Sequence, residues 1–430
     1  MSAGNLIPCM IPQLDLFKKK PVQACITSRI LEKIKPLSAL PESPDVIEFL
    51  SPARPLHYLD LNNLVVRFVV GLKTKTGAVL PNAAPYSVVD VTLHSLITQC
   101  ELFLSEELVT KWPHLYSYKS ALDVYLSAGE DARNGPLSTV IVHPDKTGTD
   151  TEEGSGWATR CSIFSQSQRV ELMGRLRADV CHLTDGAYIL DNVPLRVKLT
   201  LAPQTFYLWA KDAAQTDVQL VFYDAELYAP YFVGNPEMAI GIDMALTQQP
   251  ATYTFKSTQL KVFIHPSNSP NLTIPVAFSG KLPSTLLFTL VDAVNFNGSI
   301  TSNPYNFEHG GLQELSFFCN GNERRFLMNM DIPQGCSSVL KSLYTDMGYD
   351  REESGGNLLN VNSLKNGKFM CAVDLTVDHS GRMIQNLDLF GNVGISGRFK
   401  NAPTRALCVI LYAHYDASME ISSARRVTVY

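Results

Sequence analysis

The stretch DNVPLRVKLTLAP, residues 191–203, has a counterpart two hundred residues further on in GNVGISGRFKNAP, residues 391–403. Both stretches carry Asn-Val near the start and Ala-Pro at the end. In the first stretch Leu195, Val197 and Leu199 alternate with polar residues, which predicts a strand with one buried face. The pair of stretches therefore indicates that the chain repeats a β-rich unit.

Further correspondences extend this repeat upstream. MGRLRADV from Met173 matches MCAVDLTV from Met370, and LITQCELFLSEELV from Leu96 matches LQELSFFCNGNERRF from Leu312. A period this long excludes a solenoid and indicates an ancestral duplication of a whole domain. We therefore expect two similar β-domains side by side.

The composition is that of a globular chain with two domains. The 430 residues suffice for two separate cores, and 45% hydrophobic with 18% charged residues is typical of folded proteins. The net charge of -5 offers nucleic acid no overall attraction, so any DNA contact has to be local. Nine cysteines without C-x-x-C spacing predict free thiols in a reducing compartment. With neither a signal peptide nor a bilayer-length apolar stretch, we expect a soluble protein made inside the cell.

Turn residues and apolar runs divide the chain into four segments. Residues 1–55 are rich in proline, which predicts an irregular N-terminal arm with one short helix at Thr27–Ile34. Residues 56–234 and 249–430 contain β-branched and aromatic runs ended by Gly, Pro, Asn or Asp, as strands do. Residues 235–248, NPEMAIGIDMALTQ, predict a helix that links the two β-rich blocks.

Other helical patterns are few, mostly Ser117–Leu126 and Ser337–Tyr344. Many short strands in two similar blocks predict an all-β fold built from a pair of antiparallel sandwiches. Tandem jelly rolls are the favoured form, because a doubled sheet leaves fewer exposed strand edges.

Short motifs in a consistent order run through nearly the whole chain. They are LDLF at Leu14–Phe17, IEF at Ile47–Phe49, YLDL at Tyr58–Leu61, LHSL at Leu93–Leu96, GED at Gly129–Asp131, MGRL from Met173, GKLP at Gly280–Pro283, VDAVNFNGS from Val291, NPYNF at Asn303–Phe307 and YAHYDASMEI before the terminal Tyr430. In this the chain resembles the double jelly-roll major capsid proteins of Maverick/Polinton elements and adintoviruses. The loop at residues 147–156 is the least similar zone.

The resemblance implies two tandem eight-stranded jelly rolls. It also implies a homotrimer with a pseudo-hexameric outline, and capsomers of this kind that assemble an icosahedral shell around double-stranded DNA. Neighbouring capsomers and penton or minor capsid proteins would be the partners. No cofactor is implied. The protein would reside in the virion capsid after synthesis in the host cytoplasm, with the nucleus as one place of assembly.

Assembly contacts are expected in the N-terminal arm and in two loops. The apolar residues Leu14, Phe17, Ile47 and Phe49 should anchor the arm against jelly-roll bases or neighbouring subunits. Two interpretations of the basic run Lys18, Lys19 and Lys20 remain open: contact with packaged DNA or an internal membrane, or a clip between capsomers with solvated charges. The loops at residues 129–160 and 345–366 are candidates for the outer crown and for contacts between subunits.

The cores of the two halves are expected to hold large apolar side chains. These are Tyr58, Leu61, Leu93, Leu96 and Leu176 in the first half, and Phe288, Phe307, Phe318, Leu375 and Tyr412 in the second.

Catalytic and metal-binding patterns are weak. DKTGT at Asp145–Thr149 has the form of a P-type ATPase phosphorylation signature, but the sequence lacks the membrane helices of such enzymes, so a solvated loop is favoured. The nine histidines show no metal-ligand spacing, so we expect neither a metal site nor catalytic residues. The alternative function is a double-sandwich enzyme acting on glycans or glycopeptides, with two carboxylates about 5 to 10 Å apart between its halves. A lectin-like binding module is a weaker third.

Overall fold

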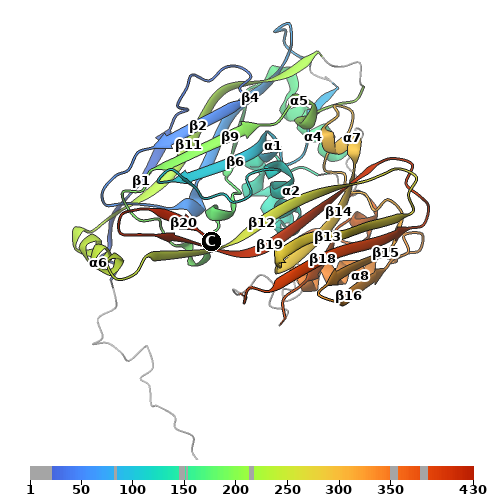
Figure 1. Ribbon diagram of the computed structural model, residues 1–430. Helices are drawn as coiled ribbons and strands as arrows, with labels where there is room; N and C mark the ends of the chain where they lie inside the picture. Colours follow the sequence, from blue (N-terminus) through green and yellow to red (C-terminus); the bar gives the residue numbers. More distant parts are fainter. Residues whose placement is uncertain are drawn as a thin grey trace, which may run out of the picture.

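Two β-rich halves lie side by side, joined by the helix α6 (Pro236–Leu246), as Figure 1 shows. The computed structural model describes residues 22–81, 85–144, 151, 154–212, 217–348, 357–377 and 386–430. Asn235 caps α6, because its side chain accepts a hydrogen bond from the backbone N–H of Glu237. The helix expected at residues 235–248 is therefore confirmed.

The first half consists of two antiparallel sheets. Within the described residues their strands follow the orders β1-β11-β4-β8 and β2-β9-β6-β7. The bounds are β1 Ile26–Ile34, β2 Val46–Ser51, β4 Val65–Thr74, β6 Ile97–Leu104, β7 Glu107–Leu108, β8 Val170–Arg175, β9 Leu195–Leu201 and β11 Val218–Gly234. In addition, β3 (His57–Leu59) pairs with β11, and β5 (Tyr86–Val88) pairs with β10 (Leu208–Ala210).

The second half repeats this arrangement. Its sheets follow the orders β12-β19-β14-β17 and β13-β18-β15-β16, again within the described residues, and β20 (Val427–Val429) pairs with β19. The bounds are β12 Ala251–His265, β13 Asn271–Lys281, β14 Thr285–Asp292, β15 Leu312–Cys319, β16 Asn322–Leu327, β17 Cys371–Asp374, β18 Phe390–Phe399 and β19 Leu407–Ile421. Counted along the chain within each half, both halves have strand orders 1-8-3-6 and 2-7-4-5. The fold is the predicted double jelly roll.

The repeat found in the sequence pairs equivalent strands of the two halves. Residues 191–203 contain β9 and residues 391–403 contain most of β18, each the seventh main strand of its half. Met173 lies in β8 and Met370 directly precedes β17, the sixth strands. The weak sequence identity therefore reflects a duplicated architecture.

Residues 26–51 correct the prediction of an irregular arm. The segment predicted as a helix, Thr27–Ile34, lies in β1, which pairs with β11 along Ile26–Ile34. The next strand, β2, pairs with β9, so the first jelly roll begins before residue 56. Pairing with strands far along the chain overrides the local helical pattern, and the prolines lie between the strands rather than within them.

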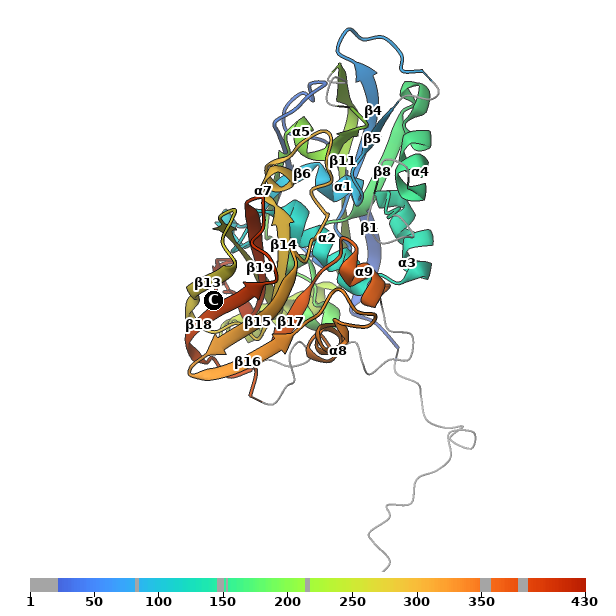
Figure 2. The same cartoon turned by 90° about the vertical axis from the view of Figure 1, so that its right-hand side faces the viewer.

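Short helices fill the connections between strands. They are α1 Thr92–Ser95, α2 Tyr116–Ser127, α3 Glu130–Asn134, α4 Ser155–Ile163, α5 Gln204–Tyr207, α7 Ala293–Asn297, α8 Ser337–Asp346 and α9 Val361–Lys365. The helices α2 and α8 confirm the two expected ones, and each lies between the fifth and sixth main strands of its half. Figure 2 shows α3 and α4 flanking β8.

Alternation along the strands builds the core. Leu195, Val197 and Leu199 of β9 are buried and the residues between them are half-buried, as predicted. The buried apolar side chains of both halves form one contiguous cluster, so the two jelly rolls share a packed boundary. We call this boundary the seam; it comprises the contacts of residues 26–234 with residues 249–430.

Candidate assembly site

A buried charge cluster lies at the seam. Lys119 of α2 is 7% exposed, and its Nζ lies 2.9 Å from Asp123 Oδ2 and 3.2 Å from Asp179 Oδ1. The same Nζ donates a hydrogen bond to the backbone carbonyl of Arg177 over 2.7 Å. Lys119 and Asp123 are four residues apart on one helix, where their side chains meet, and Asp179 comes from the connection between β8 and β9.

The second half completes this cluster. The hydroxyl of Tyr412 on β19 donates to Asp123, and the backbone N–H of Thr258 on β12 donates to Asp179 over 2.8 Å. Each carboxylate thus joins the Lys119 cation to a strand of the other jelly roll. The cluster fixes the position of one half against the other, because leaving any member unpaired in this buried setting would be costly.

Electrostatics keeps Lys119 and Asp123 ionised at neutral pH. Burial disfavours the Lys119 cation, but the charges of Asp123 and Asp179 outweigh burial and raise the pKa of Lys119. Burial also disfavours the Asp123 carboxylate, yet Lys119, Arg177 and the Tyr412 hydroxyl together lower the pKa of Asp123.

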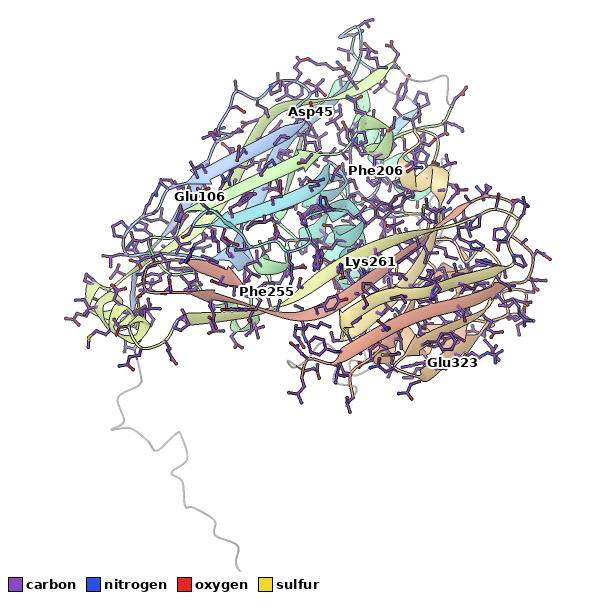
Figure 3. The ribbon with its side chains drawn as sticks, viewed as in Figure 1. Asp45, Glu106, Phe206, Phe255, Lys261 and Glu323 are labelled. Atoms are coloured by element: carbon purple, nitrogen blue, oxygen red, sulfur yellow. The ribbon has the colours of Figure 1, made fainter. Side chains whose placement is uncertain are left out.

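The aromatic ring of Tyr305 forms a second contact across the seam, and we call this ring the plug. Tyr305, in the connection between β14 and β15, is fully buried and its hydroxyl lies 2.9 Å from Ser95 Oγ of the first half. Its ring makes edge contacts with Tyr118 and Phe206, with centroids 5.7 and 6.0 Å apart. Figure 3 labels Phe206 where the first half approaches the second.

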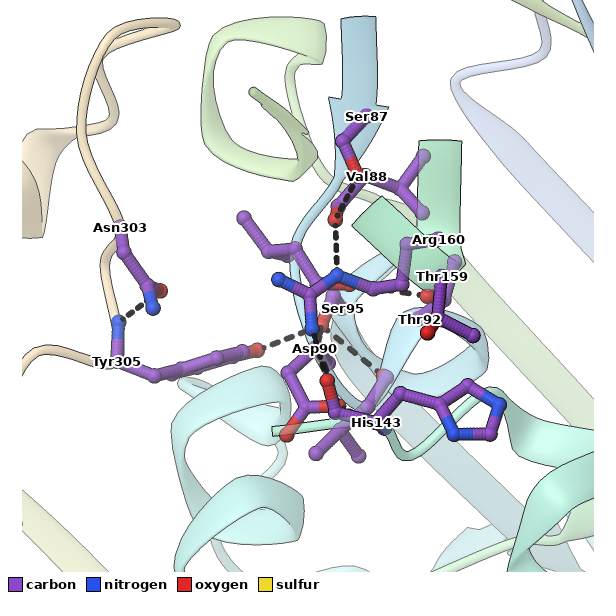
Figure 4. A network of polar contacts seen from close by, with 12 residues as sticks. Ser87, Val88, Asp90, Thr92, Ser95, His143, Thr159, Arg160, Asn303 and Tyr305 are labelled. Atoms are coloured by element: carbon purple, nitrogen blue, oxygen red, sulfur yellow. Dashed lines mark hydrogen bonds and ion pairs between the residues drawn. The ribbon is translucent and has the colours of Figure 1, made fainter. Parts of the chain in front are cut away.

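Beside Tyr305 lies a buried ion pair, drawn in Figure 4. Arg160 of α4 is fully buried; its Nε donates to the carbonyl of Val88 over 2.9 Å, and its Nη1 lies 3.9 Å from Asp90 Oδ1. Asp90 also accepts from the backbone N–H of His143 over 2.7 Å and from the Tyr125 hydroxyl over 3.1 Å. These contacts hold the connections of the first half in the shape that receives Tyr305.

The C-terminal hairpin of β19 and β20 makes a third contact. Arg425 follows β19, and its Nη2 lies 2.6 Å from Asp191 Oδ1 of the first half and 2.9 Å from Asp243 Oδ1 of α6. The Nε of Arg425 donates to the backbone carbonyl of Asp191 over 2.9 Å. Ion pairs, aromatic packing and the Arg425 contacts together join the two jelly rolls across the seam.

The first half has an open sheet face, which we define as the outward side of β1, β11 and β4. Leu31 of β1 is 52% exposed there. The guanidinium of Arg29 lies over the Phe232 ring, 5.7 Å from its centroid, and the ammonium of Lys33 lies 5.4 Å from that of Tyr228.

A ladder of ion pairs crosses the same face. Arg67 of β4 contacts Asp224 over 3.0 Å, Glu226 over 3.2 Å, and Glu171 of β8. Lys35 reaches Asp224 over 3.0 Å and Glu226 over 2.8 Å. Hydrogen bonds from Lys35 and the Tyr228 hydroxyl lower the pKa of Glu226. The face therefore combines an exposed leucine with solvent-facing cations.

The predicted assembly residues are only partly described. Leu14, Phe17, Lys18, Lys19 and Lys20 lie outside the described residues. Ile47 and Phe49 are buried in β2, where they face the core of the first jelly roll instead of anchoring an arm. The period of two along β2 explains this, because Ile47 and Phe49 share its inner face.

Of the predicted core residues, most are buried: Tyr58, Leu61, Leu93, Leu96, Leu176, Phe288, Phe307 and Tyr412. Leu375 is half-buried after the end of β17. The prediction for Phe318 is wrong, since it is 39% exposed on β15 while its neighbour Phe317 faces inward. Tyr412 lies at the seam rather than inside the second sandwich, because its hydroxyl reaches Asp123.

A cavity lies between the two halves. It has a volume of about 610 Å³, and among its lining side chains Glu130 is the single carboxylate within the described residues. No cluster of His, Cys, Asp or Glu in the described part of the chain could hold a metal ion. In that same part, no helix is long and apolar enough to span a membrane. The string Asp145–Thr149 lies outside the described residues.

The predicted loops are described in part. Residues 129–160 contain α3 and the start of α4, and Arg160 at the end of that range forms the buried pair with Asp90. Asn357, in the loop at residues 345–366, donates to the carbonyl of Leu126 across the seam over 3.0 Å. Asn357 thus contacts the other half of the same chain, whereas Arg160 pairs within its own half.

Sequence reasoning missed the residues of the seam. One signal was readable, since Lys119 and Asp123 stand four apart in the helix predicted at Ser117–Leu126. Tyr305 lies inside the NPYNF motif, but its insertion into the other half depends on tertiary packing.

Comparison with known proteins adds to this geometry. No family model matches the chain. An uncharacterized protein of Caenorhabditis elegans is 20% identical over 397 residues, which span 89% of this chain and 92% of that protein.

Solved viral structures have the same fold. A chain of the Sputnik virophage superposes with a TM-score of 0.64 at 13% identity, covering 99% of this chain and 93% of that chain. The mavirus major capsid protein gives 0.55 at 10% identity, with 99% and 95% covered. The Faustovirus major capsid protein gives 0.58 at 9% identity, with 95% and 92% covered. The fold is that of viral double jelly-roll capsid proteins.

Proposed function

We propose that this protein is a major capsid protein, with a structural rather than a catalytic role. The observation that carries the proposal is the repeated jelly roll with identical strand order, locked into one block by the buried seam. Mavirus and Faustovirus major capsid proteins have this fold over nearly their whole length, which supports the assignment.

The working unit would be a homotrimer. Three chains of two similar halves supply six similar blocks, and six such blocks closed into a ring give a pseudo-hexameric capsomer. Capsomers of that outline would tile an icosahedral shell around double-stranded DNA, with penton or minor capsid proteins at the vertices. Tight packing at the seam suits this role. A flexible hinge between the two jelly rolls would let the angle between them vary from one subunit of the shell to the next.

The finer family assignment rests on motif order. The landmarks from LDLF at Leu14–Phe17 to YAHYDASMEI before Tyr430 support a relation to Maverick/Polinton and adintovirus capsid proteins. The basic run at Lys18–Lys20 would then lie inside the shell near DNA or an internal membrane, or clip neighbouring capsomers. The loops at residues 129–160 and 345–366 would form the outer crown.

Light scattering and negative-stain electron microscopy of the purified chain test this proposal. The expected result is a trimeric mass at micromolar concentration and particles of hexagonal outline. A strictly monomeric chain over the whole micromolar range would contradict it.

A further inference from the structure

The first strands of the two halves are equivalent in topology but differ in burial. β1 and β12 each pair with the last main strand of their half, β11 and β19. β12 lies against the first half, where Thr258 contacts Asp179 and the Tyr253 hydroxyl donates to the carbonyl of Tyr188 over 3.1 Å. β1 has no such neighbour within the described residues, and Ile26 to Lys33 are exposed or half-buried.

The strand pairing shows which residue of the open sheet face corresponds to which residue of the equivalent face in the second half. Val65, the first residue of β4, pairs with Tyr228, which pairs with Lys33; Thr285, the first residue of β14, pairs with His414, which pairs with Thr258. Lys33 therefore corresponds to Thr258. Two residues further along the third strand, the pair Arg67–Glu226 corresponds to the pair Leu287–Tyr412.

These corresponding positions have different chemistry. Leu287 and Tyr412 are each 1% exposed. Asp123 of α2 contacts Tyr412, and Asp179 of the connection between β8 and β9 contacts Thr258 on the neighbouring strand. At the same level of the first half, Arg67 and Glu226 belong to the ion-pair ladder on the open sheet face. The second half thus has a covered face, and the first half has its uncovered, more polar counterpart.

In a closed ring, the open sheet face of the first half has to pack against a neighbouring half. In a ring of six alternating halves, each half touches one neighbour from its own chain and one from the next copy. If the contacts are quasi-equivalent, the elements that cover the face of the second half have counterparts that cover the open face of the first. The counterpart of α2 is α8, and that of the start of the β8–β9 connection is the described stretch after β17, residues 375–377.

We infer that the open sheet face of the first half binds the second half of another copy of this chain, through α8 and residues 375–377 after β17. This inference rests on the proposed function and adds the surface by which copies meet. The exposed Leu31 and Val377, which are 52% and 83% exposed, would supply apolar contacts. The cations of the open face, among them Lys33, make this contact more polar than the seam within one chain.

A pair of leucine substitutions tests the inference in the full chain. Leu31 lies on the open sheet face, and Leu50 lies on the outer side of β2 in the other sheet, 39% exposed. Leu31→Glu should weaken self-association about tenfold or more, because a carboxylate is forced into an apolar contact. Leu50→Glu, with the same change in charge, should associate like the wild type. Mass photometry across concentrations measures both, and circular dichroism checks that each variant is folded.

Cross-linking of wild-type protein provides a readout that needs no variant. In a mixture of ¹⁴N- and ¹⁵N-labelled chains, amine cross-links between copies should join Lys33 or Lys35 to Lys341 of α8. Association of Leu31→Glu equal to that of the wild type, or cross-links between copies that avoid β1, would overturn the inferred surface while the capsid proposal stands. A wild-type chain that never associates would overturn both.

Discussion

Replacing Lys119 by methionine should be among the most damaging single changes in this protein. The substitution keeps an unbranched side chain, one heavy atom shorter, and removes its charge. Asp123 and Asp179, which are half-buried and lie 2.9 and 3.2 Å from the Lys119 ammonium, would then face each other without their shared cation. Because those carboxylates also bind Tyr412 and Thr258, the damage falls on the seam rather than within one jelly roll.

The magnitude follows from the burial of the cluster. Removing one partner of a buried ion pair costs about 3 to 5 kcal/mol, since the remaining charge stays desolvated. In domains of 150 to 250 residues each kcal/mol lowers the Tm by about 2 to 4 °C, which gives a fall of roughly 6 to 20 °C. A solvent-exposed pair serves as the control. Lys400 and Asp331 have side chains 49% and 59% exposed, so Lys400→Met should cost about 0 to 1 kcal/mol.

Urea unfolding, followed by near-UV circular dichroism and by tryptophan fluorescence, is the assay. Wild type should unfold in one transition, whereas Lys119→Met should unfold at lower urea in two, because the halves lose their coupling. A free-energy loss in Lys119→Met no larger than that of Lys400→Met would refute the assignment of the cluster as the connection between the halves.

Three further changes follow from the same geometry. Tyr305→Ala should lower the free energy of unfolding by about 3 to 5 kcal/mol and Tyr305→Phe by about 1, measured in urea, and equal losses would mean that the ring does not act as a plug. Burial lowers the pKa of His94 well below its ordinary value of 6.5, so the unfolded chain binds a proton below about pH 6.5 that the folded chain rejects. Stability should therefore fall from pH 7 to pH 5, by at most about 1.4 kcal/mol per pH unit for this group, and less so in His94→Gln; identical pH profiles would contradict this. Deleting residues 1–55 should unfold the first half because it removes β1 and β2; a folded product of this deletion would be evidence against their place in the sheets.

Alternation and repetition made much of the fold predictable from sequence. The period of two in β9 marks its buried face, and the match between residues 191–203 and 391–403 reveals the duplication without any knowledge of strand order. The helix α2 was predictable because its composition favours a helix between two strand-like runs.

Contacts between distant segments explain what was missed. β1 forms only because β11, about two hundred residues away in sequence, offers it a paired edge, and local propensity contains no trace of that partner. Phe317 and Phe318 are adjacent, and a shift of one residue in register decides which of them is buried. Asp179 shows no sign in the sequence that it will meet Lys119, because they are joined only by folding.

The insertion of Tyr305 into the other jelly roll has a consequence for biosynthesis. The first half leaves the ribosome with the site of Tyr118 and Phe206 still empty of its aromatic occupant. Until translation reaches the region that supplies it, this apolar recess stays exposed to solvent, and we expect the nascent chain to bind chaperones at that stage. Ribosomes stalled inside the second half should accordingly retain bound chaperone, and release it once Tyr305 and the strands around it have emerged.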